Sequence, residues 1–340
     1  MAKTPDAVIK ELKAKTFAPV YFLQGDEPFY IDEISRLIEE NALTPSEKSF
    51  NQTILYGKDI SMNQLLESAR RFPMMAQRQV IILKEAQEMP DFGRKTAQEQ
   101  LVNYIKQPVP TTILVFVYKH KKINKNTSLW KTMDKKVVLV DSKKIYDNKL
   151  PTWVKSYVKN LGHSIKDKPA TLIAEHIGND LTRISNEINK MMINYPDDAV
   201  EITESMISKH IGISREYNVF ELQAALGKRD VLKANQIINF FASDPKSNPV
   251  IPIISMLFSY FSKVLLVHHN AGQTKEEAAK LLGVSPYFVA DYFTAARNYP
   301  LPKTVQIIDV LHQADLQSKG VDSSIAENQI LKELIYKIMH

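Results

Sequence analysis

The chain has 340 residues, no cysteine and a formal net charge of +6. This length exceeds that at which one hydrophobic core stops growing, so we expect two or three domains, and the lack of cysteine excludes disulfides and thiolate metal sites. The N-terminal stretch has no apolar segment typical of a signal peptide, and no apolar run approaches the roughly 20 residues of a membrane span, so we expect a cytoplasmic protein.

The first 141 residues alternate apolar runs with segments of helical period. The expected strands span residues 19–25, 50–57, 78–84, 111–119 and 137–142. The expected helices span residues 27–42, 62–71 and 92–107, with a further one near Lys131. Such alternation predicts a parallel sheet flanked by helices.

From Leu150 onward almost every segment has a period near 3.6, so the remainder is predicted to be helical. Glycine and a charged turn in HIGISREYN, residues 210–218, suggest a boundary within this helical part. The sequence therefore predicts an α/β domain over 1–141, a helical domain over 142–213 and a second helical domain over 214–340.

The turn after the first strand, LQGDEPFYIDEI, stands where a phosphate-binding loop would lie. Gly25 is followed by two carboxylates, Asp26 and Glu27, which repel phosphate, and by Pro28, which has no N–H to donate. Asp26 is a plausible N-cap for the following helix. The third strand ends in Lys84, which disfavours a divalent cation. We expect the scaffold of a nucleotide-hydrolysing domain without its chemistry, and neither cofactor nor metal.

Residues 119–144 contain nine lysines and two aspartates, a local excess of seven positive charges. One interpretation is a solvated lysine face, and the other is a surface that attracts a polyanion such as DNA. The residues proposed to lie near DNA are Lys119, Lys121, Lys122 and Lys125.

The segment 274–293 has the spacing of a helix-turn-helix. A helix that reads DNA presents Arg, Lys, Asn or Gln near its start, whereas the second helix here starts with Pro286, Tyr287 and Phe288. Packing of these aromatic residues against neighbouring helices is favoured. Sequence-specific DNA binding through this segment remains the alternative function.

The motifs together resemble one family, the delta subunit of the bacterial DNA polymerase III clamp loader. The motifs are VYFLQGDEPFYIDE, PMMAQRQVIIL, TTILVFVYKHKKINKNTSLWK, GNDLTRISNEINKM, VFELQAALGKRDVLKANQII, AKLLGVSPYFVADYFTAAR and ADLQSKG, and they extend over nearly the whole chain. The resemblance implies a degenerate AAA+ domain, an all-α lid domain and an all-α collar domain for oligomerisation.

The resemblance also implies that Phe72, Pro73, Met74 and Met75 bind the sliding clamp at the tip of a helix, with two methionines where relatives often carry aromatic residues. The alternative is that both methionines cap the local core. The implied function is to open the clamp ring for loading onto primed DNA during DNA replication, without intrinsic catalysis, as part of the DNA polymerase III holoenzyme, a nucleotidyltransferase complex. The implied partners are the beta clamp, the delta prime and gamma/tau subunits, and primed DNA within the loader. The rival hypothesis for the function is an active ATPase.

Overall fold

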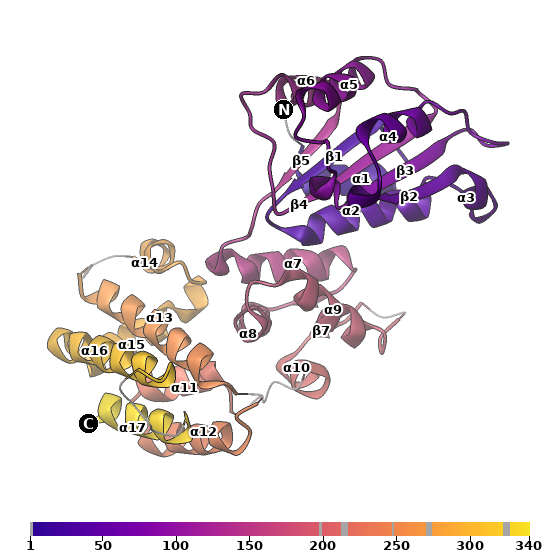
Figure 1. Ribbon diagram of the computed structural model, residues 1–340. Helices are drawn as coiled ribbons and strands as arrows, with labels where there is room; N and C mark the ends of the chain where they lie inside the picture. Colours follow the sequence, from indigo (N-terminus) through magenta and orange to yellow (C-terminus); the bar gives the residue numbers. More distant parts are fainter. Residues whose placement is uncertain (1–2, 197–198, 212–216, 247, 270–273, 322–326) are drawn as a thin grey trace. The chain divides into compact units, whose positions relative to one another are not determined.

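The computed structural model describes residues 3–196, 199–211, 217–246, 248–269, 274–321 and 327–340. The chain divides into two compact units, Met1–Ile145 and Tyr146–His340. Figure 1 shows the α/β architecture of the first unit and the helical architecture of the second. The fold class predicted from the sequence, an α/β domain with a parallel sheet followed by helical parts, is confirmed. The further boundary near residue 213 stays a prediction.

The first unit is built on a five-stranded sheet in the order β2-β3-β4-β1-β5, in which every neighbouring pair is parallel. The strands are β1 Val20–Gly25, β2 Gln52–Tyr56, β3 Gln79–Lys84, β4 Thr112–Lys119 and β5 Val138–Ser142. The inner strands are buried on both faces, which explains their continuous apolar sequences. The carboxyl ends of all five strands therefore meet at one edge of the sheet.

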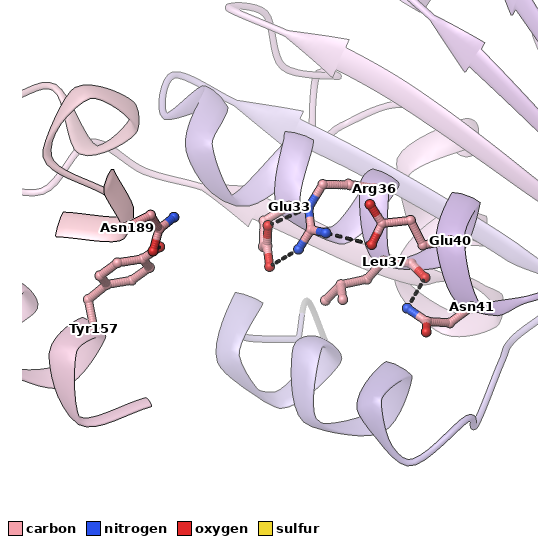
Figure 2. Close-up of polar contacts among 7 residues, drawn as sticks. All are labelled: Glu33, Arg36, Leu37, Glu40, Asn41, Tyr157 and Asn189. Atoms are coloured by element: carbon pink, nitrogen blue, oxygen red, sulfur yellow. Dashed lines mark hydrogen bonds and ion pairs between the residues drawn. The ribbon is translucent and has the colours of Figure 1, made fainter. Parts of the chain in front are cut away.

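Helices cover both faces of this sheet, as Figure 1 shows. The helices are α1 Pro5–Lys13, α2 Pro28–Asn41, α3 Pro45–Asn51, α4 Met62–Ala69, α5 Lys95–Lys106 and α6 Ser128–Lys136. Side chains of α1 and α2 pack on one face, and those of α4, α5 and α6 pack on the other. On α2, the Arg36 guanidinium pairs with Glu33 at 2.8 Å and with Glu40 at 2.5 Å (Figure 2), which are favourable helical spacings.

Three details of this unit differ from the sequence-based expectations. The N-cap of α2 is Glu27 rather than Asp26, because the Glu27 carboxylate accepts the Phe29 N–H at 3.1 Å. Phe50 and Asn51, predicted to lie in a strand, end helix α3 instead. Helix α4 ends at Ala69, so residues 72–75 lie in the following loop and not at a helix tip.

The second unit is mainly helical. Its helices are α7 Leu150–Asn160, α8 Asp167–Ile177, α9 Leu181–Met192, α10 Glu204–Ile211, α11 Val219–Gly227, α12 Val231–Ser243, α13 Val250–His269, α14 Lys275–Leu282, α15 Val289–Asn298, α16 Leu301–Ser318 and α17 Glu327–Met339. The Tyr157 hydroxyl donates to the Asn189 side chain at 3.0 Å and joins α7 to α9 (Figure 2). The structure adds one feature that the helical periodicity did not predict, a short parallel pair of β6 Ser164–Ile165 and β7 Glu201–Ile202.

Helix α13 corrects the expectation that no apolar run is long enough to span a membrane. This helix of 20 residues is long enough and apolar enough to cross a membrane, judged by its length and composition only. Eight of its residues, Ile253, Leu257 and Phe261 among them, are buried in the main hydrophobic core of the second unit. The helix therefore has the burial of a core helix.

Candidate functional site

The loop between α4 and β3, residues 70–78, is anchored at its start by buried polar side chains. The Thr112 hydroxyl donates to the Ala69 carbonyl at 2.9 Å, and the Gln79 amide donates to the Arg71 carbonyl at 2.5 Å and to Thr112 Oγ1 at 2.9 Å. Both Thr112 and Gln79 are buried. The loop thus leaves the sheet from a fixed point, because its first carbonyls are satisfied by the strands beneath it.

The four clamp-binding candidates lie together on this loop, and three of them extend into solvent. Phe72 is 83% exposed, Met74 is 62% exposed and Met75 is fully exposed, while Pro73 is partly buried. Met75 also has a left-handed backbone conformation, with φ of 50°, which is uncommon outside glycine. These exposures contradict the interpretation that the two methionines cap the local core. A cluster of large apolar side chains directed into water is typical of a binding surface.

The turn between β1 and α2, where a phosphate would bind, is closed onto β5. The N–H groups of Asp26 and Glu27 both donate to the Ser142 carbonyl, at 2.9 and 3.2 Å. Gly25 has φ of +130°, and a Cβ at this position would lie 2.0 Å from the Ser142 carbonyl oxygen. The N–H groups that a phosphate would need are therefore already used within the protein.

Lys122 extends over the same turn and carries the positive charge there. Its ammonium lies 2.6 Å from the Asp26 carboxylate and 3.8 Å from that of Asp141. The hydrogen bond to Asp26 raises the pKa of the Lys122 ammonium above its ordinary value. At the end of β3, Lys84 lies 3.9 Å from Glu39. The carboxyl edge of the sheet therefore holds charge-compensated pairs.

The other lysines proposed to lie near DNA also have neighbours within the first unit. The contacts are Lys119 with Asp32 at 2.6 Å, Lys121 with Glu88 at 3.5 Å, and the Lys125 ammonium over the Trp130 ring at 5.6 Å. The ion pairs compensate part of the positive charge of the stretch 119–144. Proximity of the four lysines to DNA stays a prediction.

The helix-turn-helix-like segment forms α14, a turn and α15. Phe288 packs against the hydrophobic core of the second unit, as predicted, whereas Tyr287 is 63% exposed. The first turn of α15 carries Asp291, whose negative charge would repel a DNA phosphate. Within the described residues, no group of three or more His, Cys, Asp or Glu side chains could hold a metal ion.

Comparison with known proteins gives matches over most of the chain. The family model described as "DNA polymerase III, delta subunit" matches residues 21–143, and that described as "DNA polymerase III delta subunit, C-terminal domain" matches residues 216–338. The DNA polymerase III subunit delta of Bacillus subtilis is 24% identical over 333 residues, which cover 96% of this chain and 94% of that protein. The solved structure of the Bacillus subtilis DNA clamp loader delta protein has 22% identity and a TM-score of 0.57, and the match covers 98% of this chain and 99% of that one.

Proposed function

The chain belongs to the DNA polymerase III delta subunit family, and on this premise we propose that it binds the ring-shaped sliding clamp and helps to hold the ring open while primed DNA enters. The observation that carries the proposal is the apolar loop at 72–75. Its Phe72, Met74 and Met75 side chains are exposed on a loop that is anchored to the sheet at its start. They are available to a partner without unfolding of the core.

In the proposed complex Met74 and Met75 enter an apolar pocket on the clamp. Methionine is unbranched and polarizable, so it fills irregular apolar pockets, although it loses more rotamer freedom on docking than an aromatic side chain does. The pair therefore suits a pocket that an aromatic pair fills in relatives, with a somewhat weaker affinity. Phe72 and Pro73 contribute to the same surface.

Holding the ring open requires that the chain bind the open clamp more tightly than the closed one. A ligand shifts a conformational equilibrium only by the difference between its affinities for the two states. In the proposal the chain itself hydrolyses no nucleotide, and ATP on neighbouring subunits drives the cycle. The closed β1–α2 turn supports this, because its N–H groups are bonded to Ser142 and its carboxylates repel phosphate.

The helical residues 214–340 are proposed to join the other loader subunits, the delta prime and gamma/tau ATPases. Several large apolar side chains of this part are exposed, including Leu232, Val305 and Tyr336. Such residues suit contacts between subunits of an assembly. The lysine-rich stretch 119–144 is proposed to approach primed DNA within the loader, and the cytoplasm is the proposed location.

Sequence-specific DNA binding by residues 274–293 is the less favoured function. Its second helix begins with Val289 and has an acidic Asp291 in the first turn, where base-reading proteins place amide or basic side chains. A footprint on duplexes of random sequence would decide the matter, and a protected site would favour this alternative.

The proposal is tested by measuring binding of the purified chain to the sliding clamp of its own organism. The chain should bind a clamp variant whose subunit interface is weakened more tightly than it binds the closed ring, because the weakened ring opens at lower cost. Equal affinities would contradict the role in ring opening, and lack of binding to either form would contradict the proposal as a whole.

A further inference from the structure

The carboxyl end of helix α3 is joined to the loop that carries the two methionines. The Asn51 side chain accepts the Met74 N–H at 2.6 Å through Oδ1 and donates to the Met74 carbonyl at 2.9 Å through Nδ2. Nδ2 also donates to the Glu47 carbonyl within α3 at 3.1 Å. One side chain therefore holds both backbone polar groups of a residue 23 positions away.

These contacts require one orientation of the Asn51 carboxamide. Its oxygen faces an N–H donor and its nitrogen faces two carbonyl acceptors, whereas the reversed amide would place donor against donor and acceptor against acceptor. Asn51 is only 4% exposed, so water has little access to this arrangement. The arrangement fixes both the position of the Met74 backbone and the direction in which the Met74 side chain leaves it.

Phe50 lies next to this contact and is 73% exposed. The Phe50 Cα is adjacent in the chain to that of Asn51. The bond lengths of the Asn51 side chain and its hydrogen bond to the Met74 N–H therefore place the Phe50 Cα within roughly 11 Å of the Met74 Cα. An aromatic side chain at this exposure contributes little to folding. Phe50 is therefore a further exposed apolar side chain on a segment whose next residue, Asn51, is hydrogen-bonded to the methionine loop.

We infer that the clamp-binding surface has two segments, the loop 72–75 and the carboxyl end of α3, in which Asn51 is a positioning residue for the loop and Phe50 is a further apolar anchor. The inference rests on the proposed function. The sliding clamp is the occupant because the hydrogen bonds of Asn51 make the second segment continuous with the loop that binds it.

The contribution of Asn51 is preorganisation. A free loop would lose backbone freedom on binding, and Met74 and Met75 would lose rotamer freedom in addition. Because Asn51 already fixes the Met74 backbone in the unbound protein, binding orders mainly the side chains. Loss of Asn51 therefore weakens clamp binding even though the methionines are still present.

The test compares clamp affinities of single variants of the full chain by surface plasmon resonance. Phe50→Ala should weaken binding about five- to hundredfold, as for an apolar anchor, with an unchanged melting temperature. Tyr146→Ala, which removes another aromatic side chain of similar exposure, should keep wild-type affinity and serves as the matched control. Asn51→Ala should weaken binding about three- to thirtyfold.

Three comparisons separate positioning by Asn51 from a general loss of stability. Ile34→Val removes one buried methylene from α2 and lowers the melting temperature without touching the loop, so it should keep wild-type affinity. In the Met74→Ala/Met75→Ala background, Asn51→Ala should have no further effect on affinity, because no methionine side chain remains to be positioned. Hydrogen exchange at the Met74 amide should accelerate in Asn51→Ala and stay slow in Ile34→Val.

The outcomes distinguish this inference from the proposed function. If the wild-type chain does not bind the clamp, the proposed function fails. If Met74→Ala/Met75→Ala strongly weakens binding while Phe50→Ala or Asn51→Ala keeps wild-type affinity, the two-segment surface is wrong and the proposed function stands. Should Asn51→Ala not fold, Asn51→Ser provides the same comparison, and the exposed Phe50→Ala variant tests the second segment by itself.

Discussion

Replacement of both Met74 and Met75 by alanine is expected to weaken clamp binding strongly. Met75 is fully exposed and Met74 is 62% exposed, so docking into an apolar pocket removes most of both side chains from water. At about 1.5–3 kcal/mol for a fully buried methionine, the pair gains about 2.5–5 kcal/mol. Ordering the side chains costs about 1 kcal/mol each. The expected loss is therefore about 2 kcal/mol, or roughly thirtyfold in Kd.

The same substitutions should leave the fold intact. Truncation of exposed side chains creates no cavity, so the free energy of unfolding should change by less than about 0.5 kcal/mol. Met133→Ala is the matched control because Met133 is completely buried in α6, and its truncation should cost about 2–5 kcal/mol of stability.

Calorimetric titration with the clamp and thermal melting, both performed on the same double variant, check this prediction. A clearly lower melting temperature with retained clamp affinity would refute the reasoning, because it would show that the methionines support the core and not the interface. Retained affinity with an unchanged melting temperature would refute the assignment of the loop as the anchor.

Four further outcomes are expected. Calorimetry should detect no micromolar binding of ATP, because the β1–α2 turn is closed onto Ser142. Gly25→Ala should cost more than about 3 kcal/mol in urea unfolding, because its Cβ would meet a backbone oxygen at 2.0 Å, whereas Gly93→Ala, with nothing within 4 Å, should be nearly neutral. Lys125→Glu should weaken DNA binding by the assembled loader and flatten its salt dependence, and an unchanged salt slope would assign the stretch to an ordinary solvated face. Burial raises the pKa of the Glu175 carboxyl from 4.5 to about 7. The folded state therefore binds the Glu175 proton more tightly than the unfolded state does, and the free energy of unfolding falls as the pH rises from 4.5 to about 7. Glu175→Gln should reduce this pH dependence of the melting temperature.

The sheet could be predicted from the sequence because strands buried on both faces have continuous apolar runs. All five predicted strands are present within a few residues of their expected bounds. Helix α3 was missed because its short sequence PSEKSFN has no apolar period, although a signal was present. Thr44 and Glu47 form a capping box around Pro45, a pattern that marks a helix start.

The contacts that give the loop its geometry could not be predicted. Asn51 and Met74 are 23 residues apart, and only the pairing of β2 with β3 brings them together. The ion pairs of the lysine-rich stretch could not be predicted for the same reason, since Lys122 and Asp26 are separated by 96 residues. A local count of charges therefore overstates the positive field of this stretch, because it omits acidic partners from distant elements.

The closed turn and the proposed clamp-binding loop of the first unit lie at opposite edges of one sheet. All strands are parallel, so the closed turn after β1 and Ser142 lie at the carboxyl edge, whereas the loop before β3 and Asn51 before β2 lie at the amino edge. Closure of the carboxyl edge therefore uses the N–H groups that a phosphate would need, without altering the proposed clamp surface. If the unit binds no nucleotide, as proposed, no nucleotide-dependent change within it can alter the proposed clamp surface. Only a difference between the affinities of the loader for the open and the closed clamp can shift the ring between these two states. In the proposed cycle, movements of the neighbouring ATPase subunits must therefore control the access of the clamp to this surface.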